Sequence, residues 1–401
     1  MLSKIIDHIL STLLVIALLK FLPVFFNLDM FDPVQGTLEQ MQVSDIAFGH
    51  IRDYDNYDID TNIIIVNNGH LNRKQIAAMI EIINQYEPKV VAIDAMFRAD
   101  KGDDMDVPLQ NAFKKTNKLV LAVELYKNQD EAEIWDTVKT SNSKFNTFAM
   151  HGYVNMYEDP DNFRTVRMIT TQQSVNDDTL LSFSAKTVME YNPELATKYL
   201  KRNNETEVIN FKRNIDKYKT YNYTEIFEQS EELENIKGKI ILIGYLGPEP
   251  GLTFTEDIFF TPMNPKYVGK SKPDMYGVVV HANVMSMILE EDFIFKFPSW
   301  FKNFLLVSIV LLNMVMFRYF RTKFFDYYQP LTIFAVLGQL VLYSTIIVSS
   351  LHLLDIEIKL GNTFFAILVC VLCFETYTDS LKPIVMGWYR SIRFNRKRKD
   401  N

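Results

Sequence analysis

Residues 62–66, NIIIV, decide the fold class, because a strand that is apolar along its whole length is buried on both faces of a sheet. A helix signal follows, with Asn72 as the N-cap residue and Gln75 placed to complete a capping box. After Pro88 the chain returns to a second apolar run at residues 89–93, KVVAI. This βαβ unit predicts two parallel strands that are neighbours in one sheet.

The segment up to residue 298 continues this alternation of strand and helix patterns. The expected elements are a helix at 107–115, a strand at 119–123, a hairpin of 152–157 with 164–170 through a turn at 158–162, a helix at 180–191, a strand at 239–243, and a helix that starts after 278–280 and runs to Leu289. These elements predict an α/β domain with a mixed, largely parallel sheet and helices packed on its faces.

Four apolar stretches, at residues 5–26, 299–317, 331–354 and 360–378, are each long enough to cross a bilayer of about 30 Å. For the first stretch a cleaved signal peptide is the alternative. Such a peptide needs small residues at a cleavage site, whereas residues 21–29 are bulky and include Pro23. We therefore expect an uncleaved anchor and four transmembrane helices, with lipid as the surrounding partner.

Basic residues indicate the orientation of these helices. Arg318, Arg321 and Lys323 lie in the loop 318–330, and seven more Lys or Arg residues lie between 382 and 399, whereas the turn 355–359 is acidic on balance. We expect a bacterial inner-membrane protein with residues 1–4 and the tail 379–401 in the cytoplasm and residues 27–298 outside it. The basic tail is then a signal for membrane topology, and its positive charges can also contact anionic lipid.

Composition excludes several function classes. A net charge of −7 over 401 residues argues against a nucleic-acid partner, which needs a basic surface. The two cysteines, Cys370 and Cys373, lie in an apolar stretch and are interpreted as small apolar residues, with a redox or metal role as the less favoured alternative. We expect no disulfide in the soluble part and no cofactor.

Several motifs resemble a known family, the second type of CHASE domain, an extracytoplasmic sensory module of bacterial receptors. They are residues 89–97 (KVVAIDAMF), Asp159–Asp161 with Arg164 and Arg167, residues 237–244 (KGKIILIG), Asp257 with Thr261 and Pro262, and residues 276–283 (YGVVVHAN). One membrane helix before the domain and three after it are also similar to that family. The chain departs from the family's pattern at residues 245–251 and at Tyr276, so its ligand is not fixed by the resemblance.

The resemblance implies a sensory or regulatory protein whose outer domain binds a small ligand or an envelope protein. Members commonly carry a cytoplasmic output domain, whereas about twenty residues follow the last apolar stretch here, so we expect signalling through a separate membrane or envelope partner. A non-catalytic scaffold subunit of an envelope complex is the alternative. An enzyme is the least favoured class, because the sequence shows no hydrolase or kinase motif.

Candidate ligand-binding residues follow the predicted strands, since ligands of open α/β sheets gather at the carboxyl ends of the strands. They are Asp94, Gly244, Asp257, Thr261 and His281. Each of these residues has an alternative, purely structural role. A carboxylate can cap a turn, and a glycine or Pro262 can shape a turn. A histidine at the start of a helix can serve packing alone. We expect Asp94, Gly244, Asp257 and His281 to line one cleft. The acidic residues at 100–106 are interpreted as a solvated turn, with calcium as the alternative.

Two polar residues lie deep in the predicted membrane helices, Gln339 and Glu375. A carboxylate in that position avoids lipid and faces another helix or water. We expect these residues to help dock a partner membrane protein. The alternative is that Glu375 bonds within its own bundle.

Overall fold

The computed structural model describes residues 2–25, 45, 47–127, 135–158, 165–176, 178–248, 257–264, 272–358 and 361–384. The chain divides into two units, one of residues 38–294 and one of residues 1–37 with 295–401. The turn expected after Glu158, Arg164 of the expected hairpin, residues 249–251, and the basic tail from residue 385 lie outside the described residues.

A seven-stranded sheet forms the centre of the unit 38–294. Its strands run in spatial order β11 (Tyr218–Asn222), β1 (Asp60–Asn67), β12 (Ile240–Gly244), β2 (Val90–Ile93), β3 (Leu119–Tyr126) and β4 (Thr137–Lys139), with β5 (Met150–Tyr153) also paired to β3. Every pairing is parallel except β3 with β4. The predicted mixed, largely parallel sheet is confirmed.

The strand β1 is buried on both faces, as its continuous apolar run predicts. Ile63 and Ile65 pack into one core, and Ile64 and Val66 pack into another on the opposite face. The helix α4 (Arg73–Gln85) follows with both bonds of the predicted capping box present. The strand β2 is parallel to β1 but is not its neighbour, because β12 lies between them. The prediction of adjacent strands was therefore wrong.

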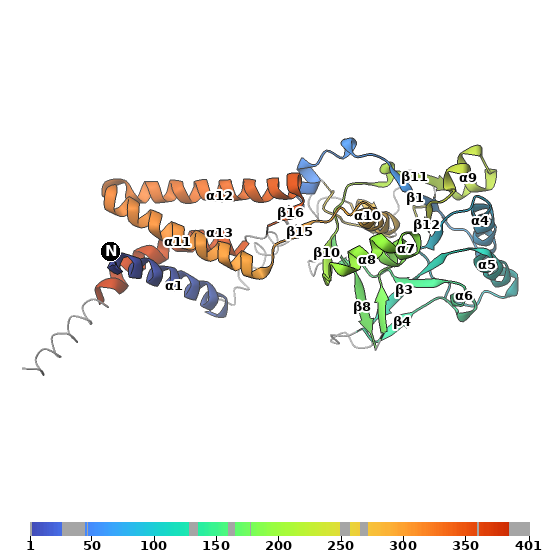
Figure 1. The fold of residues 1–401 in the computed structure, drawn as a ribbon, viewed down its shortest axis with the longest axis horizontal. Coiled ribbons are helices and arrows are strands. Elements are labelled where there is room, and N and C mark those ends of the chain that lie inside the picture. The colour runs from blue at the N-terminus through green and yellow to red at the C-terminus, as the bar shows by residue number, and fades with distance from the viewer. Residues whose placement is uncertain are drawn as a thin grey trace, which may run out of the picture. The chain divides into compact units, whose positions relative to one another are not determined.

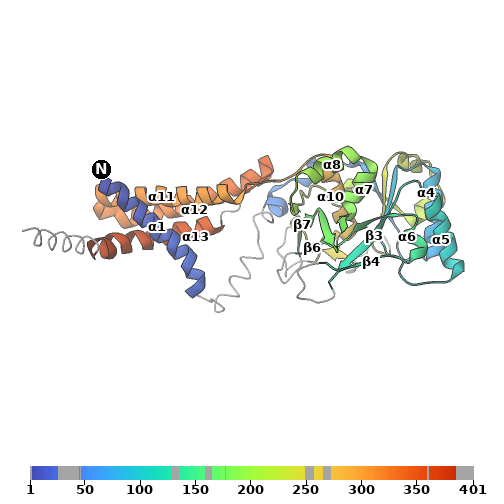
Figure 2. The ribbon, with the colours of Figure 1, turned by 60° about the horizontal axis from the view of Figure 1, so that its bottom comes forward.

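Helices cover both faces of the sheet (Figure 1). One core contains residues of α4, α5 (Asp103–Lys115), α6 (Ser143–Asn146), α9 (Tyr223–Glu228) and η5 (Glu231–Ile236). The other contains residues of α7 (Phe183–Tyr191), α8 (Pro193–Lys201) and α10 (Gly277–Leu289). Figure 2 shows α4 and α5 separated from α7 and α8 by the sheet. The result is a three-layer α/β/α arrangement.

Smaller sheets lie outside the main one. They are β10 (Thr206–Val208) with β7 (Val166–Thr170) and β6 (Tyr157–Glu158), β8 (Gln172–Val175) with β9 (Asp178–Leu181), and β13 (Ile258–Phe259) with β14 (Met275–Tyr276). Short helical turns are η2 (Ala47–Ile51), η3 (Tyr54–Asn56) and η4 (Ile215–Lys217).

The hairpin expected from 152–157 and 164–170 is only partly correct. Residues 152 and 153 belong to β5 of the main sheet, and only β6 pairs with β7. Gly152 lies against the start of α7, where a Cβ atom would approach the Phe183 Cα to 2.5 Å. Parallel pairing with β3 places β5 in the main sheet, and the glycine permits the close approach of α7. The helix expected from 180 begins later because Ser182 caps it at the Ala185 N–H.

The acidic residues at 100–106 do not form the expected solvated turn. Asp103, Asp104 and Asp106 make the first turn of α5, where negative charge favours the helix N-terminus. The Asp106 side chain is buried and accepts a 2.5 Å hydrogen bond from the Arg73 guanidinium of α4. This buried ion pair ties α5 to α4.

The second unit is a helical bundle. Its elements are α1 (Leu2–Phe25), β15 (Phe295–Lys296), α11 (Ser299–Lys323), η6 (Phe325–Tyr327), α12 (Tyr328–Leu354), β16 (Ile356–Glu357), α13 (Gly361–Glu375) and η7 (Thr376–Leu381). Val15, Val310 and Phe317 pack in its core together with the free thiols Cys370 and Cys373.

Three of the four predicted transmembrane helices are long and apolar enough to cross a membrane: Ser299–Lys323, Phe325–Leu354 and Thr363–Ile384. The fourth, expected at residues 5–26, coincides with α1, whose apolar part among the residues with described side chains is the shorter helix Asp7–Leu19. Among the described residues the expectation of four such helices was therefore wrong.

Candidate functional site

A pocket of about 400 Å³ lies at the carboxyl end of the main sheet. We call it the acidic pocket, because Asp94, Glu124 and Asp257 line it, together with His281. Its other residues are Val154, Asn155, Met156, Phe259 and Gly277. Asp94, Gly244, Asp257 and His281 were expected to line one cleft, and this is confirmed for Asp94, Asp257 and His281 but wrong for Gly244.

Asp94 directly follows β2, and its backbone N–H donates to the Ile243 carbonyl of β12 at 2.8 Å. That bond fixes the backbone and leaves the side chain at the end of the strand. Among the described residues none donates a hydrogen bond to the carboxylate, so the expected alternative of a turn cap finds no support there. Burial, and secondarily the charge of Asp257, raise the pKa of Asp94 to about 7.

Asp257 lies across the pocket beside the first residue of α10. Its backbone has a φ of 56°, a left-handed conformation that is uncommon for a residue with a side chain. Its carbonyl accepts a hydrogen bond from the Gly277 N–H at 3.0 Å. A Cβ atom on Gly277 would lie 3.0 Å from the Asp257 Oδ1, so the glycine makes room for the carboxylate.

The two aspartates differ in environment. Desolvation raises the pKa of Asp257 to about 6, although the residue keeps exposed surface at the pocket rim. Asp94 is half-buried and shows the larger shift, in the same direction. At pH 7 the Asp94 carboxyl group is protonated about half of the time and the Asp257 carboxyl group is mostly ionised, and a nearby cation would favour the charged form of both. The pocket is therefore better suited to a cation than to an anion.

His281 lies inside α10 and does not begin this helix, which was expected to start near it. Its ring is buried, packs edge-on against Phe183 at a centroid distance of 5.2 Å, and has Nδ1 3.1 Å from the Ser184 Oγ. Burial lowers its pKa to about 3. The ring is thus neutral at physiological pH and does not act as a proton switch there.

Two further polar residues, Glu124 and Asn155, line the site, and the sequence analysis did not identify them. Glu124 belongs to β3 and pairs with Arg98 at 2.5 Å. Asn155 holds the end of that strand, because its side chain accepts from the Leu125 N–H at 2.7 Å and donates to the Leu125 carbonyl at 3.0 Å. Glu124 is the one charged residue in the apolar run 119–126, and this charge in a buried strand could have indicated a site residue.

Gly244 and Thr261 are not among the residues that line this pocket. Gly244 ends β12, and a Cβ atom there would lie 2.6 Å from the Val278 side chain, so the glycine permits close packing of α10 on the sheet. Thr261 is buried and donates its hydroxyl to Asp274 at 2.5 Å, while its N–H donates to the same carboxylate at 2.9 Å. Both residues have structural roles in these contacts.

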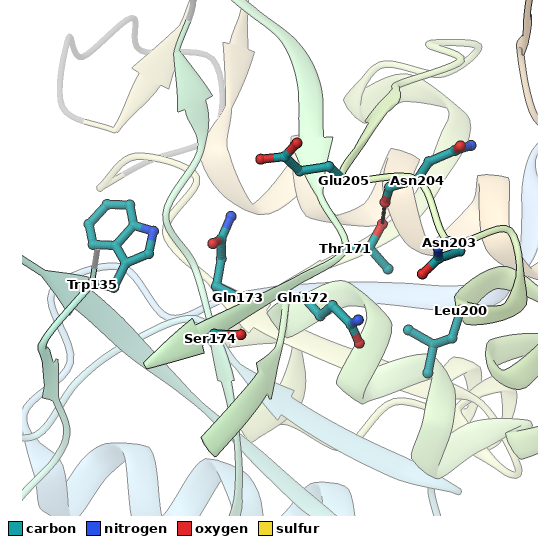
Figure 3. A pocket seen from close by; sticks show the side chains of 9 residues that line it. All are labelled: Trp135, Thr171, Gln172, Gln173, Ser174, Leu200, Asn203, Asn204 and Glu205. Atoms are coloured by element: carbon teal, nitrogen blue, oxygen red, sulfur yellow. Dashed lines mark hydrogen bonds between the residues drawn. The ribbon is translucent and has the colours of Figure 1, made fainter. Parts of the chain in front are cut away.

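A second hollow of about 400 Å³ lies beside β8 and the end of α8 (Figure 3). Its side chains are mostly exposed amides and hydroxyls, and Trp135 stands to one side of them. The Thr171 hydroxyl donates to Tyr199 at 3.1 Å and to the Asn204 carbonyl at 3.5 Å. No charged groups converge in this hollow as they do in the acidic pocket, since Glu205 is its single ionisable residue.

The two polar residues predicted to dock a partner lie in the helical bundle. The Gln339 amide exchanges two hydrogen bonds of 2.9 Å with Asn313 of α11, so its polar atoms are satisfied inside the bundle. Glu375 ends α13, is half-buried, and lies close enough to Arg321 and Tyr328 for electrostatic interaction. Docking of a partner stays a prediction. Among the described residues no cluster of His, Cys, Asp or Glu has the arrangement of a metal site.

Fold and pocket together define a doubly wound α/β domain that shares one chain with membrane-length apolar helices. The chain belongs to the CHASE2 domain family, whose sequence model matches residues 11–316, and this is a family of extracytoplasmic sensory domains. No curated protein matches the chain, and no solved structure does.

Proposed function

We propose that this protein is a sensory receptor of a bacterial inner membrane whose CHASE2 domain binds a small organic cation in the acidic pocket. The observation that carries this proposal is the convergence of Asp94, Glu124 and Asp257 in one pocket at the carboxyl end of the sheet. Arg98 neutralises only one of the three carboxyl groups. A cation that enters the pocket would regain Coulomb energy from the other two.

The apolar part of the pocket supports the proposal that the bound cation is organic. Val154, Met156 and Phe259 line it together with the carboxyl groups. Small-molecule sites combine such apolar surface with a few placed polar groups. A volume of about 400 Å³ accommodates a small amine with its alkyl chain.

The order of the helices along the chain supports a route by which ligand binding in the acidic pocket reaches the membrane helices. Gly277 and His281 of α10 line the pocket, and nine residues join the end of α10 to the start of α11. A ligand that repositions α10 would change the strain on that connection. The receptor then passes its signal to a separate membrane or envelope protein and catalyses no reaction itself.

The bundle supports an orientation with both termini in the cytoplasm. Asp7 near the start of α1 bonds Arg318 near the end of α11 and Lys382 after the end of α13. These helix ends therefore meet at one end of the bundle, and it is the end with the basic residues. A periplasm-active reporter fused after Pro298 should be active, and one fused after Arg321 should be inactive. The reverse pattern would overturn this orientation.

Ligand binding is tested with the full-length protein in nanodiscs by thermal unfolding at pH 7.5. The probe is the diamine putrescine, and 1,4-butanediol is its uncharged isostere. We expect putrescine to raise the melting temperature and butanediol to leave it unchanged, because a ligand stabilises the state it binds. Asp94→Asn and Glu124→Gln should weaken the effect of putrescine.

Asp178→Asn is the matched control, since Asp178 is an exposed residue of β9 that does not line the acidic pocket. It should retain the full response. Equal responses to putrescine and butanediol, or an equal loss in Asp178→Asn and Asp94→Asn, would show that the acidic pocket is not a cation site.

A further inference from the structure

A second charged pocket, of about 530 Å³, lies within the helical bundle. We call it the basic pocket, because Arg318, Arg321 and Lys382 line it. The carboxylate among its lining residues is Asp7. Three helical segments thus bring three cations and one anion to the same end of the bundle.

The Asp7 carboxylate is shared between two of these cations. Its Oδ2 accepts from the Arg318 guanidinium at 2.9 Å and from the Lys382 ammonium at 2.6 Å, and its Oδ1 accepts from the Tyr377 hydroxyl at 3.1 Å. The third cation, Arg321, donates to the Thr378 hydroxyl at 2.7 Å and pairs with Asp379. Among the residues that line the pocket, three cations face one carboxylate. Asp379 and Glu375 do not line it, but both interact with Arg321 and balance the two remaining positive charges.

These cations keep accessible surface. The side chains of Arg318, Arg321 and Lys382 are 23%, 28% and 32% exposed. Guanidinium and ammonium groups carry several N–H donors each, so each of them can bind more than one acceptor. Planar guanidinium groups are well matched to phosphate oxygens.

Apolar side chains complete the basic pocket. Phe325 and Phe374 line it beside the cations, and Phe325 is 73% exposed. The pocket lies where membrane-length helices end, which is the level of lipid headgroups when such helices span a bilayer. Cations next to exposed aromatic rings at that level fit a phosphate attached to an acyl chain.

We propose that the basic pocket binds the phosphate group of an anionic lipid headgroup. The proposal is independent of the acidic pocket and its ligand. Arg321 contacts the phosphate, Arg318 and Lys382 balance its charge, and Phe325 contacts the acyl chain. Asp7 competes with the phosphate for its two cations. This competition gives the proposal a test that a purely structural ion pair would not satisfy.

The test uses the full-length protein in neutral detergent and measures binding by the shift in melting temperature. The probes are dihexanoyl phosphatidylglycerol, dihexanoyl phosphatidylcholine and inorganic phosphate. We expect phosphatidylglycerol to bind best. Arg321→Gln should weaken its binding about fivefold, because a basic residue at the membrane surface contributes about 1 kcal/mol. Asp7→Asn should strengthen its binding, because two cations lose their competing carboxylate.

Lys302→Gln is the matched control, since Lys302 lies at the opposite end of α11 from Arg318. It should bind phosphatidylglycerol as the wild type does. Equal binding of phosphatidylglycerol and phosphatidylcholine, or weaker binding by Asp7→Asn, would overturn the site. Binding of inorganic phosphate as tight as that of the lipid would overturn the lipid as the source of the phosphate.

Discussion

The substitution Asp94→Asn should stabilise the protein at alkaline pH and leave its stability nearly unchanged at acidic pH. An asparagine has the shape of a protonated aspartate and carries no charge. The folded protein raises the pKa of Asp94 from 3.8 to about 7 through burial and the charge of Asp257. The folded state therefore keeps a proton that the unfolded state has released, so this residue lowers stability progressively from about pH 4 to about pH 7.

The size of the effect follows from the shift. A difference of about three pKa units corresponds to at most about 4 kcal/mol, at about 1.4 kcal/mol for each unit. Asp94 is half-buried and faces the pocket solvent, which screens its charge. We therefore expect about half of that value, about 2 kcal/mol, as the gain in the free energy of unfolding at pH 8.

The assay is urea unfolding of the full-length protein in detergent, followed by tryptophan emission at pH 4.5 and pH 8. Of the three tryptophans, Trp135 lies in the unit 38–294 and the other two, Trp300 and Trp388, lie in the other unit. Replacement of those two by phenylalanine isolates the signal of the α/β domain. Asp178→Asn in the same background controls for the loss of one exposed negative charge.

Two results would refute this reasoning. A gain at pH 8 that equals the gain at pH 4.5 would show that the ionisation of Asp94 does not oppose folding. A loss of stability at pH 8 would show that the Asp94 carboxylate is favoured in the folded state, and the acidic pocket would then already contain a compensating cation.

Three further predictions concern buried residues of the α/β domain. Asp106→Asn should lower the free energy of unfolding by about 3 kcal/mol in the same urea assay, because it leaves the buried Arg73 guanidinium without its anion. Gly244→Ala should cost about 1–3 kcal/mol through its clash with Val278, and a second substitution, Val278→Ala, should recover part of that loss. The ¹⁵N signals of His281 should not titrate between pH 5 and pH 8, because burial lowers its pKa to about 3.

Local signals were sufficient to predict the elements β1, α4 and β2. The apolar run of β1 and the capping box of α4 depend on residues within a few positions of each other. Lateral order in the sheet depends on pairing between distant segments, and this is why the insertion of β12 between β1 and β2 was not predicted. The placement of β5 failed for the same reason, since its pairing with β3 is not local.

The candidate site, like the sheet, could be predicted only in part from the sequence. Asp94 follows a strand-like motif, and ligands of parallel sheets gather at the carboxyl ends of the strands, so its place in the pocket could be inferred. Asp257 precedes the short strand β13, and its place in the pocket depends on tertiary contact with Gly277. Gly244 could not be assigned from sequence, because a glycine at a strand end permits either a ligand or a helix to approach. Only the position of Val278 decides between them. The pairing of Glu124 with Arg98 joins β3 to a loop, and no local pattern indicates it.

The most direct test of the account is hydrogen–deuterium exchange of the full-length protein in nanodiscs, with and without putrescine. Putrescine should slow the exchange of the amides at residues 94–97 and in the first turns of α10, and it should also change the exchange in α11. Asp94→Asn should abolish both effects. Exchange that is unchanged by putrescine at the pocket, or a change at the pocket that never reaches α11, would contradict the claim that the acidic pocket signals to the membrane helices.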